Sequence, residues 1–71
     1  MSEIRITVKA ARINAGIELR EAAKKLGISI GTLGNYEAGR TSPKMEIAAR
    51  MSELYNIPID NLSFLRREGT I

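Results

Sequence analysis

The sequence predicts a compact all-α domain of five short helices, and three observations carry this prediction. First, apolar residues recur at spacings of three and four along most of the chain, which is the period of a helix with one buried face. Second, residues that commonly cap helices stand where these apolar stripes begin and end. Third, the chain has 71 residues, which is enough for one domain with a small core.

The first helix is expected from about Val8 to Ala15. Thr7 is a good N-cap residue for it, and Gly16 is placed to end it. Apolar and polar residues alternate from Met1 to Ile6, which fits either a short strand or a terminal arm. At this length an arm is the expected form, and residues 1–7 are therefore assigned to an N-terminal arm.

The second helix is expected over about Glu18–Leu26 and the third over about Ile30–Tyr36. Acidic residues stand in the first turn of the second helix and lysines in its last turn, the order that the helix dipole favours. Gly27, which can take a positive φ, follows this helix, and Ser29 is placed to cap the next one. Two short helices joined by such a turn predict a helix-turn-helix over about residues 19–38.

The fourth helix is expected over about Lys44–Tyr55. Ser42 is its expected N-cap, Pro43 fits the first turn, and Asn56 is placed to close it. A fifth, short helix is expected over about Ile59–Leu65, with its apolar residues buried.

The turn between the second and third helices is the most informative part of the chain. Ala23 is small, as the crossing point of two closely packed helices requires, and Gly27 follows four residues later. Leu33 then returns to the core side at helical spacing. Such a unit presents its second helix outward, where it can enter the major groove of DNA. The domain that contains it is assigned to residues 8–65, followed by a tail over residues 66–71.

A larger set of residues matches the pattern of one family. These residues are Val8-Lys9-x-Ala11-Arg12, Gly16-Ile17, Glu21-Ala22-Ala23, Leu26-Gly27-Ile28-Ser29, Thr32-Leu33, Asn35-Tyr36-Glu37-x-Gly39-Arg40, Pro43 and Asn56-Ile57-Pro58-Ile59-Asp60-x-Leu62. With them the chain resembles the lambda-repressor/Cro-type helix-turn-helix family, also called the XRE family. The resemblance implies a DNA-binding regulator, typically a small repressor from a phage or mobile element that acts as a dimer on operator DNA.

The resemblance also implies a salt bridge between Arg12 and Glu37. In the family, an arginine on the first helix often pairs with the glutamate after the recognition helix. We expect this pair to be mostly buried and to fix the angle of the third helix, and the alternative is two solvated charges. A buried pair that loses one partner typically destabilises a protein by about 3–5 kcal/mol.

The outward face of the third helix departs from the usual composition of a DNA-reading helix. It is expected to comprise Ile30, Gly31, Thr32, Gly34 and Asn35. None of these is a lysine or an arginine, so the common bidentate contact to guanine is not offered by the helix itself. Asn35 could contact an adenine edge or a phosphate, Thr32 a base or a phosphate, and Ile30 a thymine methyl group. The two glycines suggest a close backbone approach to DNA or to a partner, or sequence drift.

Contacts to phosphate are expected from the residues just after the third helix. The candidates are Arg40, Thr41, Ser42 and Lys44, with Arg20 as a weaker one, although each could equally be an ordinary solvated side chain. A homodimer is expected on DNA, through a surface around Ile57, Asn61, Phe64 and Leu65.

We therefore predict a sequence-specific transcriptional regulator that binds double-stranded DNA with its third helix in the major groove, and we expect it to be a repressor of the phage or mobile-element type. The alternative is a protein-interaction module, an antirepressor or antitoxin with the same fold. The net charge of +3 is compatible with DNA binding but does not require it.

The composition argues against other classes of protein. The chain has no histidine or cysteine and no glycine-rich loop with a lysine, so neither an enzyme nor a metal or cofactor site is expected. No small-molecule ligand is evident. No apolar run reaches the length of a membrane span or a signal peptide, and a cytoplasmic location is expected.

Overall fold

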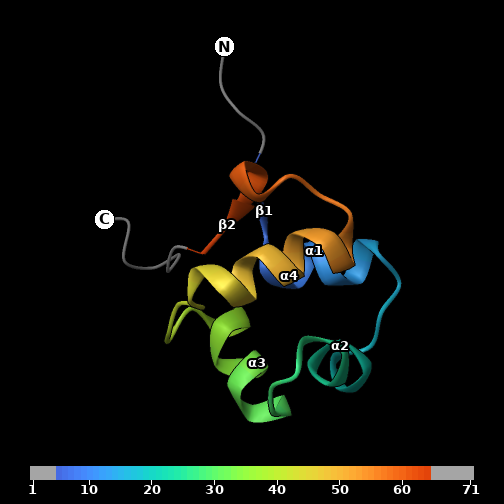
Figure 1. Ribbon diagram of the computed structural model, residues 1–71, viewed down its shortest axis with the longest axis vertical. Coiled ribbons are helices and arrows are strands. Elements are labelled where there is room, and N and C mark those ends of the chain that lie inside the picture. The colour runs from blue at the N-terminus through green and yellow to red at the C-terminus, as the bar shows by residue number, and fades with distance from the viewer. Residues whose placement is uncertain (1–4, 65–71) are drawn as a thin grey trace.

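The computed structural model describes residues 5–64, and in this range four α-helices surround one small core (Figure 1). The helices are α1 (Val8–Asn14), α2 (Leu19–Leu26), α3 (Ile30–Ala38) and α4 (Met45–Tyr55). A two-residue strand, β1 (Ile6–Thr7), precedes α1, and a 3-10 turn, η1 (Ile59–Asn61), leads into a second short strand, β2 (Leu62–Ser63). The predicted helix-turn-helix corresponds to α2 and α3.

The predicted caps explain why these helices begin and end where they do. The Thr7 side chain accepts a hydrogen bond from the Ala10 amide over 3.1 Å and caps α1. Ser29 does the same for α3, accepting from the Thr32 amide over 3.0 Å. Gly27 ends α2 with a φ of 76°, the left-handed conformation that glycine adopts without strain. The first four helices therefore lie within one or two residues of their predicted bounds.

The predicted N-cap of α4 at Ser42, with Pro43 in the first turn, is wrong, although the helix begins within one residue of its predicted bound. The helix begins at Met45, and Lys44 is its N-cap residue in an extended conformation, with no capping hydrogen bond from its side chain. Pro43 lies half-buried in a surface groove that Ala48 and Leu62 also line. The N-cap therefore lies two residues after the predicted one, at the extended Lys44.

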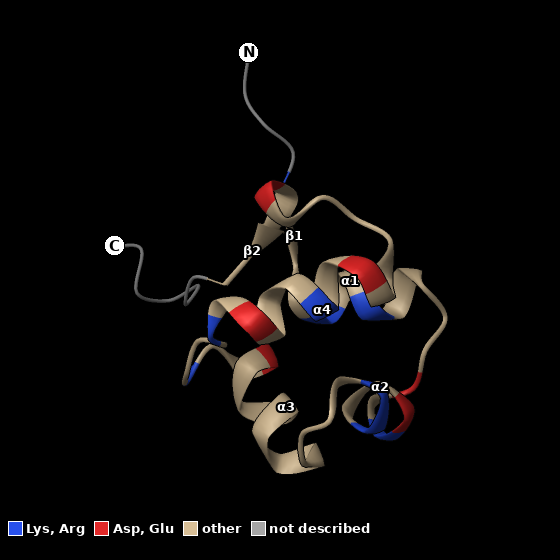
Figure 2. Ribbon diagram, in the orientation of Figure 1, with Lys and Arg blue, Asp and Glu red and all other residues tan. Residues whose placement is uncertain are grey.

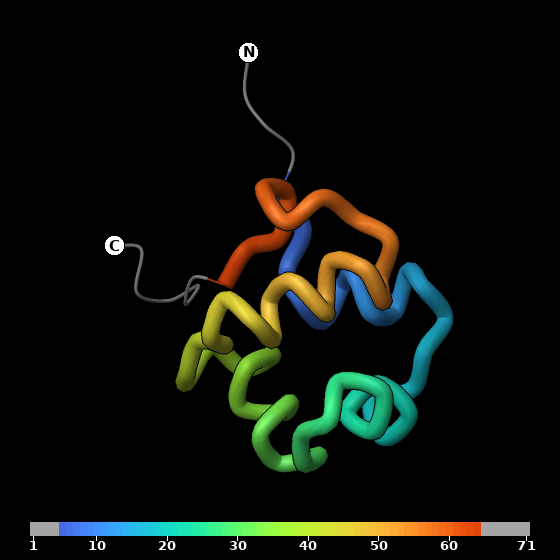
Figure 3. Tube along the Cα trace, viewed as in Figure 1, coloured from blue at the N-terminus to red at the C-terminus, as the bar shows by residue number. Residues whose placement is uncertain are grey.

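The predicted fifth helix is also wrong, and all-α describes the fold only in part. After one 3-10 turn the chain becomes extended at Leu62, which pairs in parallel with Ile6 of β1 (Figure 3). The strand alternative for the N-terminal segment thus applies to Ile6–Thr7. Pairing with a strand from the other end of the chain satisfies backbone groups that a helix of this length would leave free. Residues 1–4 and 65–71, which hold most of the predicted arm and tail, lie outside the described residues.

The core lies where all four helices and β2 meet. Its buried members are Val8, Ala11, Ala22, Ala23, Leu26, Leu33, Met51, Tyr55 and Leu62. Small alanines in α1 and α2 let these helices approach their neighbours, while leucine and methionine fill the space between them. Within residues 5–64, no helix is both long enough and apolar enough to cross a membrane.

Candidate nucleic-acid interface

The third helix is held by one face and leaves the other open. Leu33 is fully buried in the core, and Tyr36 packs half-buried beside it. On the opposite side, Gly31 and Asn35 are exposed, and 43% of the Ile30 surface is accessible to solvent. α3 is nine residues long, or about 13 Å at 1.5 Å per residue, so its open side could span several base pairs.

A salt bridge anchors α3 to α1. The Nε of Arg12 lies 2.6 Å from Oε2 of Glu37, and a second guanidinium nitrogen donates to Oε1 over 3.3 Å. The third nitrogen of the guanidinium donates to the Ile17 carbonyl over 2.9 Å. The side chains of the pair are only 11% and 8% exposed. The predicted pair is therefore present, and it ties the end of α3 to the segment between α1 and α2.

This ion pair lies close to an unpaired hydroxyl. The hydrogen bond to Glu37 raises the pKa of Arg12 above its ordinary value, so the guanidinium stays charged at any physiological pH. Tyr55 of α4 is buried, and its hydroxyl has no hydrogen-bond partner within the described part of the chain. Burial, with a smaller contribution from the negative charge of Glu37, raises the pKa of Tyr55 to about 12.

The polar side chains at the start of α3 form a local network. The Ser29 hydroxyl donates to the Thr32 hydroxyl oxygen over 2.9 Å while accepting from the Thr32 amide. The Thr32 hydroxyl keeps its own hydrogen, which can be donated to an acceptor outside the protein. Thr32 is half-buried, and it therefore lies at the edge of the open side of α3 rather than at its centre.

At the other end of α3, Asn35 and Arg40 are joined. Arg40 donates a hydrogen bond from Nη1 to Oδ1 of Asn35 over 3.0 Å, and both side chains are exposed. Thr41, Ser42 and Lys44 continue from Arg40 along the exposed loop that leads to α4. The structure thus groups Asn35 with the predicted phosphate contacts, and it separates this group from Ile30 by the length of the helix.

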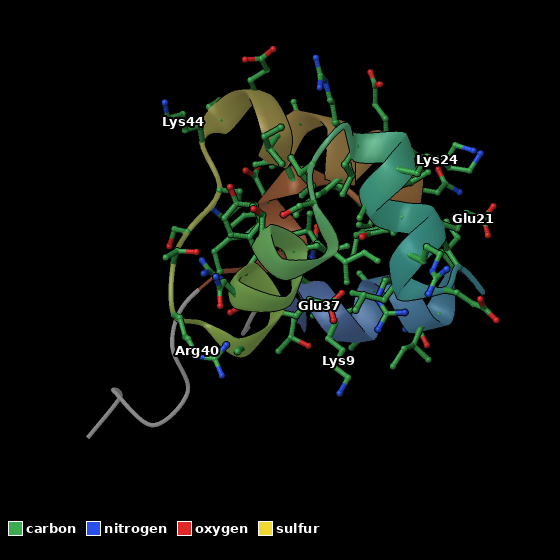
Figure 4. All side chains as sticks on the ribbon, turned by 90° about the horizontal axis from the view of Figure 1, so that it is seen from below. Lys9, Glu21, Lys24, Glu37, Arg40 and Lys44 are labelled. Carbon is green, nitrogen blue, oxygen red and sulfur yellow. The ribbon has the colours of Figure 1, made fainter. Side chains whose placement is uncertain are left out.

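The charges are arranged on both sides of α3 rather than on it. The helix carries no lysine or arginine, and its only charged side chain is Glu37, which faces Arg12 (Figure 2). Viewed from below, Arg40 and Lys44 lie at one edge of the molecule and Lys24 of α2 at the opposite edge, with α3 between them (Figure 4). Cations on both flanks of a helix whose open side carries no charge fit a duplex whose phosphates border a groove.

Sequence reasoning missed one residue that positions the motif. Arg50 of α4 donates to the carbonyl of Leu26, the last residue of α2, over 3.2 Å, and it also contacts Glu46 over 3.2 Å. The contact satisfies a free carbonyl at the end of α2 and places positive charge at the negative end of the helix dipole. Arg50 follows Glu46 by one turn of α4, so that contact is local in the sequence. The contact with Leu26 joins two different helices, and no local sequence pattern indicates it.

Comparisons with known proteins agree with this geometry. The profile of a family described as helix-turn-helix matches residues 8–62. Over 55 residues, the chain is 40% identical to the HTH-type transcriptional regulator ImmR of Bacillus subtilis (strain 168) and 29% identical to the cryptic phage CTXphi transcriptional repressor RstR of Vibrio cholerae. Each match covers 78% of this chain, and 43% and 50% of the two relatives.

The matched region therefore makes up half or less of the length of each of these two relatives. No solved structure matches it significantly. The profile covers most of the chain, from the first residue of α1 to the first residue of β2, and the helix-turn-helix of α2 and α3 lies inside that range. The chain belongs to the XRE-type helix-turn-helix family.

Proposed function

We propose that this protein is a transcriptional regulator of the phage-repressor type, which binds double-stranded DNA in a sequence-specific manner. The observation that carries the proposal is the arrangement of α3, buried along one side, open and uncharged on the other, and flanked by cations. The names of the two relatives, a transcriptional regulator and a phage repressor, support the same function.

In the proposed complex the open side of α3 enters the major groove. Ile30, Gly31, Thr32 and Asn35 face the bases, and Arg40, Thr41, Ser42 and Lys44 contact the backbone beyond the helix. The Arg12–Glu37 pair holds α3 at the angle that the groove requires. Because the phosphate contacts release counterions, affinity falls with salt by a slope of about 0.9 per neutralised phosphate.

A salt titration tests this proposal. Retention of random duplexes by the full chain is measured between about 50 and 200 mM salt, followed by selection of preferred sequences. Lys44→Ala should reduce the slope by about 0.9, whereas Lys9→Ala, which removes an exposed cation on α1, should leave it unchanged. Binding that does not weaken with salt would contradict the assignment of the loop residues.

We also propose that the protein acts as a homodimer on a palindromic site. Two symmetry-related copies of α3 would lie about 34 Å apart, one turn of the duplex. Ile57, Asn61 and Phe64 of the predicted dimer surface are all half-buried, and Leu65 lies outside the described residues. Phe64 shares a groove of about 340 Å³ with Met45, whose surface is 74% exposed. Sedimentation of Met45→Glu with and without a selected palindrome tests this surface, since a charge there should prevent dimerisation.

A second candidate function is a protein-interaction module that uses the same fold. The exposed Ile30 and the absence of cations on α3 are the observations that favour it. The two functions are separated by the retention experiment. Recovery of a palindrome supports the regulator, and a failure to retain any duplex at low salt supports the interaction module.

A further inference from the structure

We propose that Asn35 and Arg40 form a single base-reading unit that recognises guanine rather than adenine. The inference rests on the proposed function, because it concerns which base the open side of α3 reads. It assigns Arg40, so far treated as a contact to phosphate, a part in specificity. The recognition helix has no arginine of its own, and this unit would supply one from the following turn.

The chain geometry after α3 brings Arg40 back onto the helix. Gly39 takes a φ of 79°, which reverses the direction of the backbone at the helix end. The Arg40 amide then donates to the Asn35 carbonyl over 3.0 Å, and the Arg40 side chain donates to Oδ1 of the same asparagine over 3.0 Å. Two hydrogen bonds therefore connect these residues, one between backbones and one between side chains.

Asn35 is the polar side chain at the centre of the open side of α3. Gly31 and Ala38 lie four residues before it and three residues after it, on the same side of the helix, and both are exposed. A Cβ added at Gly31 would meet no atom closer than the Ser29 hydroxyl at 3.9 Å, and one added at Gly34 would meet nothing within 4 Å. Packing within the domain does not require these glycines. The small residues around Asn35 leave room for a duplex to approach it.

The hydrogen bond from Arg40 determines what Asn35 can offer to a base. Recognition of adenine by asparagine uses the amide oxygen to accept from N6 and the amide nitrogen to donate to N7. Here Oδ1 already accepts from Nη1 of Arg40 over 3.0 Å, so an adenine N6 amino group that bonded to the same oxygen would lie beside this second donor. A donor would then face a donor, and adenine is disfavoured.

Guanine fits the same unit. The groups left for a ligand are the Nδ2 hydrogens of Asn35 and the free N–H groups of Arg40, all of which are donors. In the major groove, guanine presents the acceptors N7 and O6. The only donor that this base pair presents in the major groove is the N4 amino group of cytosine, which lies on the far side of O6 from N7. A unit that consists only of donors therefore selects the purine with two acceptors.

Selection from random duplexes, with the full chain and with Arg40→Ala, tests the inference. The wild-type chain should select guanine at the position that Asn35 contacts, with a preference over adenine of about 5- to 150-fold, the range for one bidentate contact. In Arg40→Ala the Asn35 amide oxygen is released, and the preference at this position should change to adenine. Both side chains are exposed, so the variants should fold, which circular dichroism checks.

Two further variants identify the cause of a change in preference. Asn35→Asp keeps an acceptor for Arg40 but replaces the Nδ2 donor with a second acceptor oxygen, so affinity should fall for all sequences and the guanine preference should weaken. Asn35→Ala removes that acceptor and should abolish the preference. Lys44→Ala, a matched loss of one loop cation, should weaken binding to every sequence equally.

The outcomes separate this inference from the function on which it rests. If the wild-type chain selects adenine at this position, or if Arg40→Ala weakens all sequences equally as Lys44→Ala does, the inference is overturned while DNA binding stands. If the wild-type chain retains no duplex at low salt, the proposed function fails, and the inference fails with it. A change from guanine to adenine in Arg40→Ala supports it.

Discussion

The two sides of α3 differ in almost every physical respect. The inner side is held by a fully buried leucine, a half-buried tyrosine and a salt bridge whose carboxylate is 8% exposed. The outer side has Ile30, two glycines, an alanine and Asn35, and a Cβ added at either glycine would meet no atom closer than 3.9 Å. A helix this short is marginal by itself in water, so contacts on the inner side must hold it in place. The outer side is consequently open to change without loss of the fold.

The comparison predicts opposite responses to substitution. Changes on the inner side should lower stability, whereas changes on the outer side should alter binding and leave stability equal or higher. The following experiments, from the largest expected effect to the smallest, test whether the two sides are independent.

Arg12→Ala is expected to have the largest effect. It leaves the Glu37 carboxylate buried without its cation, which typically costs about 3–5 kcal/mol. A domain of this size has a total stability of roughly 5 kcal/mol, so the variant should be largely unfolded or melt far below the wild type. Urea unfolding followed by circular dichroism measures the change. As a control, Arg12→Met combined with Glu37→Leu removes both charges and should recover most of the loss. An unchanged melting temperature for Arg12→Ala would show that the pair does not hold α3.

The second expected effect is a loss of stability at alkaline pH. The folded protein raises the pKa of Tyr55 from its ordinary value of 10.0 to about 12, so folding favours the neutral phenol. The resulting stability is fully present below pH 10 and is lost as the pH rises through 12, with a total of roughly 2–3 kcal/mol.

Comparison with Tyr55→Phe isolates this effect from the titration of lysines. The phenylalanine variant lacks the ionisable group and should lose less stability between pH 10 and 12. It should be at least as stable as the wild type at pH 7, because the buried hydroxyl has no partner in the described residues. A parallel decline of both proteins with pH would contradict the assignment.

The smallest effects are expected when a glycine is replaced by alanine. The sign of the change in stability depends on the backbone conformation at the glycine. Gly34→Ala meets nothing within 4 Å and should stabilise α3 by about 0.5–1 kcal/mol, through helix propensity. The same change at Gly27, with its φ of 76°, should destabilise the domain by about 1–2 kcal/mol. Thermal melts of the two variants provide the measurement. If the duplex approaches α3 closely, Gly34→Ala should also bind DNA more weakly despite its higher stability.

The helices were predictable because their signals are local. Thr7, Ser29 and Gly27 stand within one turn of the groups that they cap, and the apolar stripes repeat within each helix. The carboxyl-terminal segment was mispredicted because its conformation depends on Ile6, almost the full described length away in the chain. Apolar spacing at Ile59 and Leu62 fitted a helix, but the tertiary pairing decided the outcome.

The candidate site was predictable as a surface but not as a set of contacts. Exposure of Ile30, Gly31 and Asn35 followed from the helical period, since Leu33 had to face the core. The bond between Asn35 and Arg40 did not, because it depends on the backbone reversal at Gly39. Arg50 was missed for a similar reason, since its partner Leu26 belongs to another helix.

The pairing of β1 with β2 has a consequence for the engineering of this domain. It brings the two ends of the described chain next to each other, at Ile6 and Leu62. Neighbouring ends are the condition under which a chain can be circularly permuted, with a short linker joining the old ends and new ends opened in an exposed loop. The loop around Thr41 and Ser42 is such a place. A permuted chain opened there should keep the order of its helices in space while freeing the residue next to the proposed base-reading unit for attachment of a probe.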